Sequence, residues 1–442
     1  MAYLDNIFFV ILLACGFGFF AMSVKKIIRN IKLGQDINRS DNPAARWANM
    51  ALIALGQQKM VKKPIAGLLH IIVYLGFIII NIELLEIIID GIFGTHRIFG
   101  SMGMAYNFLI ASFEILAVLV LVSVIIFLVR RNIIKLKRFI HSDLKGWPHD
   151  DANYILYFEI VLMSLFLLMN AADYHLQFKD LEHYRQVGSF PISQFIAPLF
   201  DGLSVSMVIL LERTFWWAHI TGILIFMNYL YYSKHLHILL AFPNTYFANL
   251  EPLGKFKNSA AVTAEVKMMM DPSIDPFAAP AANTVVEAPA KFGASDVQDL
   301  NWVQLLNAYT CTECGRCTDA CPANMTGKKL SPRKIMMDTR DRLQEVGKNI
   351  DANKGVFVPD NKTLLNDYIT PEELWACTSC NACVEECPVN INPLSIIMDM
   401  RQFLVMEQSA APAPINTMFS TIENNGAAWA YNQQDRLNWK DE

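Results

Sequence analysis

The sequence predicts an all-α protein, in which a bundle of five membrane-spanning helices is followed by a cysteine-rich α-helical domain. Of the 442 residues, 53% are hydrophobic and 18% are charged, and the long apolar runs fall almost entirely within residues 1–245. Residues 255–442 have the composition of a soluble protein. Eight of the nine cysteines lie in two short runs of this second part, which indicates a metal framework rather than a disulfide scaffold.

Five segments are apolar over the roughly 20 residues that a membrane-spanning helix needs. These segments are 7–24, 64–89, 104–129, 154–171 and 203–232. The first is too long, and too weakly basic at its start, for a cleaved signal peptide, so we expect it to remain as an anchor. The sequence therefore predicts a multi-pass membrane protein.

Basic residues between the spans predict the orientation. Residues 25–63 carry nine Lys or Arg side chains and 130–150 carry six, whereas the opposite loops hold only Arg97, Lys179 and Arg185. By the positive-inside rule, the N-terminus lies outside and the cysteine-rich part lies in the cytoplasm, at the inner (cytoplasmic) membrane. Thiolates stay reduced in that compartment, which agrees with the clustering of the cysteines.

Each cysteine run reads C-x2-C-x2-C-x3-C-P, the spacing of two-cluster ferredoxins. In that arrangement the fourth cysteine of one run binds the cluster of the other run. We therefore expect two [4Fe–4S] clusters, one held by Cys311, Cys314, Cys317 and Cys387 and the other by Cys377, Cys380, Cys383 and Cys321. A zinc site would need only two CxxC pairs and no trailing Cys-Pro. Cys15 lies alone in an apolar segment.

Helix-start signals around the runs predict an α-helical ferredoxin domain rather than the small hairpin kind. Ser331-Pro332 and Asn392-Pro393 each place a capping residue before proline, and we expect the second of these helices to reach about Glu407. The segment 370–373 (Thr-Pro-Glu-Glu) has the pattern of a capping box.

Two histidines of the last span lie 18 residues apart, at His219 and His237. In a continuous helix this separation equals five turns, so both rings would share one face, roughly 27 Å apart along the axis. His235 would point away from that face. Two such imidazoles, with His70 of the second span near the level of His237, are typical of ligands to b-type haem. The alternative is that they are hydrogen-bonded core or interface histidines.

These histidines, the stretch SKHLHILLAFPNTYF (233–247) and five spans of N-out topology resemble the haem b membrane subunit of respiratory nitrate reductase and its relatives in heterodisulfide reductase and sulfite-reduction complexes. The resemblance implies two b haems, with His70 and His237 on the cytoplasmic-side haem and His219 on the outer one. Ile80 stands where that family has a further histidine. His175 is then the best substitute ligand, with His96 behind it, and one haem rather than two stays open.

Acidic residues also lie at membrane depth. Glu83, Glu86 and Asp90 share one face near the outer end of the second span, and Arg213 lies in the fifth. Charged groups in a membrane are costly and usually functional, so we expect a quinone site with Glu83, Glu86 and Arg213 as its candidate residues. Contact of the acids with haem propionates or with interfacial water is the alternative.

The sequence divides into a membrane cytochrome b domain (1–250), a flexible Ala/Pro-rich linker (251–298), a dicluster ferredoxin domain (299–408) and a C-terminal tail (409–442). Residues 300–407 resemble the cluster subunit of heterodisulfide reductase. The tail segment NNGAAWAYNQQDRLNW is similar to one that precedes a CCG-motif domain in fused relatives. We expect a separate partner subunit to supply that domain.

The combined features predict an electron-transfer subunit of a respiratory complex, which links menaquinone or another quinone to a cytoplasmic CCG-domain iron–sulfur protein or flavoprotein. The resemblance extends to quinone-interacting and electron-transfer-flavoprotein:menaquinone oxidoreductases. Two alternatives stay open: a membrane polyferredoxin that assists the maturation of another enzyme, and a structural anchor that only docks partners. A net charge of −4 gives no indication of nucleic-acid binding. No Gly-rich nucleotide loop follows a strand pattern, so we expect no flavin or nicotinamide bound to this chain.

Overall fold

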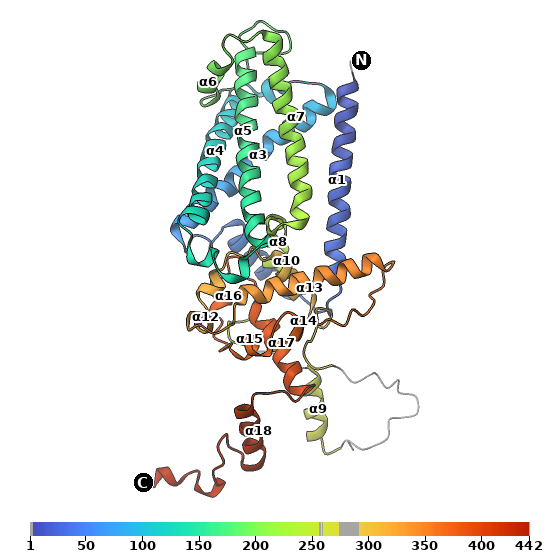
Figure 1. Cartoon of the computed structure of the whole chain (residues 1–442), viewed down its shortest axis with the longest axis vertical. Helices are drawn as coiled ribbons and strands as arrows, with labels where there is room; N and C mark the ends of the chain where they lie inside the picture. Colours follow the sequence, from blue (N-terminus) through green and yellow to red (C-terminus); the bar gives the residue numbers. More distant parts are fainter. Residues whose placement is uncertain (1–2, 256–257, 259, 274–290, 442) are drawn as a thin grey trace.

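The computed structural model describes residues 3–255, 258, 260–273 and 291–441. Its first part is a bundle of long helices that stands on a smaller, compact helical part (Figure 1). Within the described residues there is no β-sheet, and the extended pairings are two isolated bridges. The predicted all-α class is therefore confirmed for the described part of the chain.

Five helices are long and apolar enough to cross a membrane, which confirms the five predicted spans. They are α1 (Leu4–Ile31), α3 (Pro64–Phe93), α4 (Met104–Leu128), α5 (Trp147–Leu176) and α7 (Val205–Tyr229). The helices α1, α3 and α5 are longer than the predicted apolar segments, because further turns continue them beyond the apolar windows. Shorter helices lie between spans, α2 (Pro43–Met50) and α6 (Ser193–Ile196), and α8 (His237–Tyr246) follows the last span.

The helices α3, α4, α5 and α7 pack side by side, and α1 lies along α7 and α3 at one side of the bundle (Figure 1). Large apolar side chains such as Phe9, Phe113, Phe166 and Ile220 fill the interior. We call the end of the bundle that contacts the cysteine-bearing part the near end. Here α1 and α7 finish and α3 and α5 begin. The opposite end is the far end.

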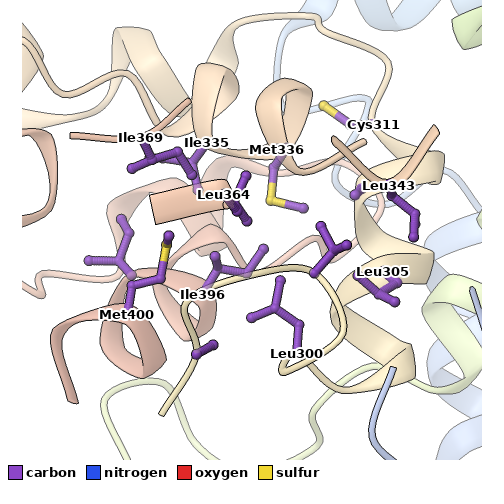
Figure 2. Close-up of a cluster of buried hydrophobic side chains, with 14 of the residues drawn as sticks. Leu300, Leu305, Cys311, Ile335, Met336, Leu343, Leu364, Ile369, Ile396 and Met400 are labelled. Carbon is purple, nitrogen blue, oxygen red and sulfur yellow. The ribbon is translucent and has the colours of Figure 1, made fainter. Parts of the chain in front are cut away.

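The cysteine domain, residues 291–406, is built from short helices around one longer helix. These are α10 (Trp302–Thr310), α11 (Arg316–Asp319), α12 (Pro322–Met325), α13 (Pro332–Ala352), α14 (Leu364–Asp367), α15 (Pro371–Trp375), α16 (Ala382–Glu386) and α17 (Pro393–Met406). Figure 2 shows its core, in which Leu300, Leu305, Ile335, Leu343 and Ile396 converge. Helix α13 lies across the near end of the bundle (Figure 1).

The three predicted helix starts of this domain are confirmed. Ser331 and Asn392 each accept a hydrogen bond from the backbone three residues on, at the start of α13 and of α17. Thr370 and Glu373 form the predicted capping box at the start of α15. These local signals suffice because each satisfies the free N–H groups of its own first turn.

The predicted continuous helix from His219 to His237 is wrong. The last span ends in a 3-10 turn, Leu230–Tyr232, and Ser233 then takes an extended backbone with φ −110° and ψ 146°. His237 therefore begins a separate helix, α8. Because the rotation of about 100° per residue holds only within one continuous helix, it does not place His219 and His237 on one face. A serine capping the next turn explains the break, because the Ser233 hydroxyl accepts a hydrogen bond from the His235 N–H.

The loop that follows α1 is fastened to the cysteine domain. The Gln35 backbone forms an isolated parallel bridge with Asn301, its N–H donating to Leu300 O at 2.8 Å and its carbonyl accepting from Trp302 N at 3.1 Å. The Trp302 indole N–H also donates to Ile37 O at 3.1 Å. The first span is thus tied to residues far along the chain.

Two segments flank the cysteine domain. In the predicted linker, 260–270 form helix α9 (Ala260–Met270), and 256–257, 259 and 274–290 lie outside the described residues. Beyond α17, helix α18 (Ala413–Asn425) buries none of its residues and projects away from the domain (Figure 1).

Candidate functional site

The two cysteine runs form two loops with one backbone design. In the first loop Glu313 and Gly315 have positive φ angles of 55° and 75°, and in the second Ser379 and Asn381 have 56° and 61°. These left-handed positions flank the second cysteine of each run, and the third cysteine, Cys317 or Cys383, lies in the short helix that follows, α11 or α16. Glycine and asparagine tolerate this left-handed conformation best.

The fourth cysteine of each run lies with the other run. Cys311, Cys314, Cys317 and Cys387 all line one small cavity, together with Cys383. In the second set, Cys321 lies within electrostatic range of Cys377 and Cys383. The crosswise grouping expected from the spacing is thus what the geometry presents, and the assignment of ligands to clusters stays a prediction.

Burial gives these thiols a strong preference for the protonated form. It raises the pKa of Cys311 and of Cys383 to about 12 and that of Cys387 to about 11. A buried thiolate at neutral pH therefore needs a bound cation to replace its proton, which iron in a cluster provides. The donor set fits a thiolate-held cluster.

The first cysteine loop lies against the near end of the membrane bundle. The Arg316 guanidinium donates to the carbonyls of Lys59 and Met60, just before α3, at 3.2 and 3.3 Å. Buried Arg333 pairs with Asp143, which precedes α5, and also donates to Arg138 O at 2.7 Å. Ion pairs and backbone contacts thus hold the loop beneath α3 and α5.

Three histidines gather at this near end, close to the first loop. Burial, together with the neighbouring imidazoles of His237 and His70, lowers the pKa of His235 to about 3, so its ring is neutral. The Nδ1 of His237 donates to Lys234 O at 3.1 Å, which leaves Nε2 free for a metal. The Nδ1 of His70 is buried without a hydrogen-bond partner. His70 and His237 therefore fit the donor set of a haem.

His219 lies deeper in the bundle, with its Nδ1 donating to Leu162 O at 3.1 Å and Nε2 again left free. His175 comes thirteen residues after Leu162 in α5, which is roughly 20 Å along the axis. It lies at the far end, 3.6 Å from Asp201. His96 is also at the far end, 3.3 Å from Asp173. The structure thus brings neither His175 nor His96 beside His219.

The far end contains a cavity of about 300 Å³, which includes all three candidate quinone residues, Glu83, Glu86 and Arg213. Phe9, Trp216 and Trp217 contribute aromatic surface to the same lining. Most of the other lining residues are charged or polar, so the cavity combines an aromatic wall with a dense set of polar groups. Its volume lies at the lower end of the range for small-molecule sites.

One arginine organises the acids of this cavity. Arg97 donates to Glu83 at 3.0 Å, to Asp173 at 2.9 Å and to Asn170 at 2.7 Å. Glu86 accepts from the Tyr106 hydroxyl and from Phe99 N, both at 2.9 Å. The second carboxylate oxygen of Glu83 is buried without a partner, so it is free to accept a hydrogen bond from a ligand in the cavity.

Arg97, Asp173 and the two tryptophans are site residues that sequence reasoning missed. Arg97 had a detectable signal, since it is the only basic residue of its loop and lies near three acids of the preceding span. Asp173 had none, because its approach to Arg97 depends on how α5 packs against α3.

Comparison with known proteins agrees with this geometry. A family model described as 4Fe-4S dicluster domain matches residues 310–391. The cysteine domain therefore contains a dicluster domain, which supports the two predicted [4Fe–4S] clusters.

Curated relatives extend the similarity to the membrane bundle. The chain is 29% identical to the probable iron-sulfur-binding oxidoreductase FadF of Bacillus subtilis, over 99% of this chain and 61% of that protein. It is 26% identical to the EtfAB:quinone oxidoreductase of Syntrophomonas wolfei, over 92% of this chain and 55% of the relative. A component of the dihydromethanophenazine:CoB–CoM heterodisulfide reductase of Methanosarcina mazei is 29% identical over 33% of this chain and 35% of its own length.

The chain thus spans less than two thirds of the length of each of these relatives. Comparison with solved structures finds no match. Together with the five apolar helices, the matches indicate an iron–sulfur protein with a multi-pass membrane region, similar to electron-transfer subunits of oxidoreductases.

Proposed function

We propose that the chain is a membrane electron-transfer subunit of a respiratory redox complex, which passes electrons between the menaquinone or quinone pool, haem b, two [4Fe–4S] clusters and a cytoplasmic partner. The observation that carries the proposal is the junction at the near end. There Arg316 of the first cysteine loop binds the backbone just before α3, and its charge lies close to His70, which neighbours His237. Candidate ligands for clusters and for haem thus lie at one interface, which supports the proposal.

The residues that would hold the cofactors follow from their free donor atoms. The two crosswise cysteine sets would hold the clusters, and His70 with His237 would hold a haem through their free ring nitrogens. His219 would serve a second haem, for which the described residues offer no obvious partner ligand at its level. When bound, clusters and haem supply one-electron carriers. The polypeptide orients them and excludes water from them.

The far-end cavity would bind the quinone head group. Trp216 and Trp217 would flank the ring, and the free oxygen of Glu83 would accept a hydrogen bond from a quinol hydroxyl and then its proton. Arg97 holds Glu83 in place for that role. His219 lies six residues from Arg213 along α7, about 9 Å nearer the clusters, so a carrier there would shorten the gap between the cavity and the near end.

The proposed location is the inner membrane, with the N-terminus and the far-end cavity outside and the cysteine domain in the cytoplasm. The basic segments 25–63 and 130–150 flank the near end, which supports this orientation. The proposed partner is a CCG-domain iron–sulfur protein or a flavoprotein within a hetero-oligomeric complex. The relative named EtfAB:quinone oxidoreductase supports a flavoprotein partner, and the heterodisulfide reductase relative supports membership of a multi-subunit complex.

The test is purification of the full chain from native membranes, followed by iron and haem quantification and identification of the subunits that accompany it. We expect about eight iron atoms in two clusters, a b-type band after dithionite reduction, and a redox partner. A protein with clusters but without haem would favour the polyferredoxin alternative and overturn the proposal.

The quinone site is tested in the same preparation with menadiol as the reductant. Glu83→Gln should slow the menadiol-driven reduction of the cofactors by about 100-fold, the lower end of what a positioned acid–base group contributes. Glu114→Gln is the matched control, because Glu114 is a buried membrane carboxylate that binds the backbone of Ile192 and Ser193 and does not line the cavity. Equal losses in the two variants would contradict the assignment.

A further inference from the structure

One residue at the near end touches both kinds of redox-ligand site. The carbonyl of Lys234 accepts the hydrogen bond from His237 Nδ1 at 3.1 Å. Its ammonium group forms an ion pair with Glu313, which lies between Cys311 and Cys314 of the first cysteine loop. A single side chain and its own carbonyl thus connect the histidine to the loop.

The ion pair is buried and anchored on both sides. The side chains of Lys234 and Glu313 are 9% and 2% exposed. Lys234 also donates to Pro148 O at 2.5 Å, and its backbone N–H donates to Asp151 at 3.2 Å. Arg340 of α13 binds the other oxygen of Glu313 at 2.7 Å. Because most polar groups of this network have partners, the network favours one relative position of its parts.

The first loop carries this carboxylate at a left-handed backbone position. Glu313 has a positive φ of 55°, which a non-glycine residue adopts at a cost. The equivalent residue of the second loop, Ser379, has the same backbone but no charge. The acid is therefore specific to the loop that faces the membrane bundle.

We propose that Lys234 and Glu313 are positioning residues, which hold the first cysteine loop in register with His237 and set the charge beside the first cluster. This inference rests on the proposed function, since it assigns a role toward the cluster and the haem named there. Buried charges near a cluster shift its reduction potential. Loss of the Lys234 cation should lower that potential, and loss of the Glu313 anion should raise it.

General docking of the cysteine domain is the competing explanation. The same interface contains a half-exposed ion pair, Lys62 with Glu385 at 2.8 Å, whose side chains are 56% and 48% exposed. If Lys234 only contributed to docking, its removal would loosen the interface without shifting the potential of the first cluster, as is expected for removal of Lys62. Lys62→Met is therefore the matched control.

The experiment is a potentiometric titration of the full-length protein, with the first cluster followed by EPR. We expect Lys234→Met to shift its midpoint potential down, Glu313→Gln to shift it up, and Lys234→Met/Glu313→Gln to bring it back towards the wild type. Lys234→Arg should retain the wild-type value because it retains the charge. Lys62→Met should leave the potential unchanged. Shifts of the same sign in the two single variants, or none, would overturn the proposal.

Two further outcomes are decided by the same set of variants. If Lys234→Met loses the cluster, its recovery in Lys234→Met/Glu313→Gln supports the pairing and continued loss overturns it. Hydrogen exchange gives a readout independent of activity. Amides of 311–316 and 233–237 should lose protection together in Lys234→Met, and loss in only one segment would contradict the register role. A wild-type protein without clusters or haem would refute the proposed function instead.

Discussion

The two cysteine loops have the same backbone and different neighbours. Positive φ angles recur at equivalent positions, Glu313 with Ser379 and Gly315 with Asn381. The first loop nevertheless packs under the membrane bundle, with Glu313 buried, whereas Cys380 of the second loop is exposed. The cysteine spacing thus determines the shape of each loop, and the residues between the cysteines determine what each loop contacts.

This contrast gives the two loops different roles in the proposed electron path. The buried loop faces the near-end histidines, and the loop with the exposed cysteine is the one that the proposed cytoplasmic partner would approach. Substitutions in the two loops should therefore differ in their effects.

Replacement of the fourth cysteine of either run should have the largest effect, which is loss of one cluster. Cys321→Ala should damage the cluster of the second run first, and Cys387→Ala that of the first run, because each fourth cysteine lies with the opposite loop. Cluster-resolved EPR with an iron count on each variant measures this. Early loss of the first-run signal in Cys321→Ala would disprove the crosswise grouping.

Arg333→Met should cost about 3–5 kcal/mol at the first loop, since it leaves a buried carboxylate without its partner. The side chains of Arg333 and Asp143 are 1% and 4% exposed. The expected readout is faster proteolytic release of the cysteine domain from the membrane bundle. A release rate equal to that of the wild type would show that this pair does not secure the first loop.

Gly315→Ala should destabilise the first loop by about 1–3 kcal/mol through backbone strain and crowding. Gly315 has a φ of 75°, and an added Cβ would lie 2.6 Å from an Arg333 nitrogen. Thermal loss of cluster absorbance gives the comparison with Asn381→Gly, which should be nearly neutral because glycine adopts the same backbone freely. Equal losses of thermal stability in the two variants would contradict the expected difference between the two loops.

Lys62→Met at the second loop should have the smallest effect, about 0–1 kcal/mol. Its partner Glu385 belongs to α16, and both side chains are about half exposed. Release of the cysteine domain should therefore change little, and the small change should disappear in high salt. If Lys62→Met speeded release of the cysteine domain as much as Arg333→Met does, the two loops would contribute equally to docking, contrary to this prediction.

The sequence predicts well those features that depend on nearby residues. The five spans, the capping box at Thr370 and the helix starts at Ser331 and Asn392 are all encoded within a few residues of where they appear. The helix break at Ser233 was missed because no proline or glycine marks it, and only a serine cap produces it.

Contacts between distant segments could not be predicted. Arg97 reaches Asp173 across 76 positions of sequence, and Lys234 reaches Glu313 across 79. Each pairing depends on how two helices or two domains pack, which hydrophobic periodicity does not specify. The candidate quinone residues Glu83, Glu86 and Arg213 nevertheless line one cavity, and their role at a quinone stays a prediction. Charge at membrane depth is the rare signal by which the sequence singles them out.

The hydrogen bonds between the loop after α1, at Gln35, and residues 298–302 have a consequence for biosynthesis. The first span leaves the ribosome long before its fastening exists, because Trp302 lies 265 positions after Ile37. All five spans are therefore synthesised while the near end of α1 is still unfastened, and the loop is secured only when the start of α10 emerges. The first helix can therefore be fastened at its near end only after synthesis of the cysteine domain has begun.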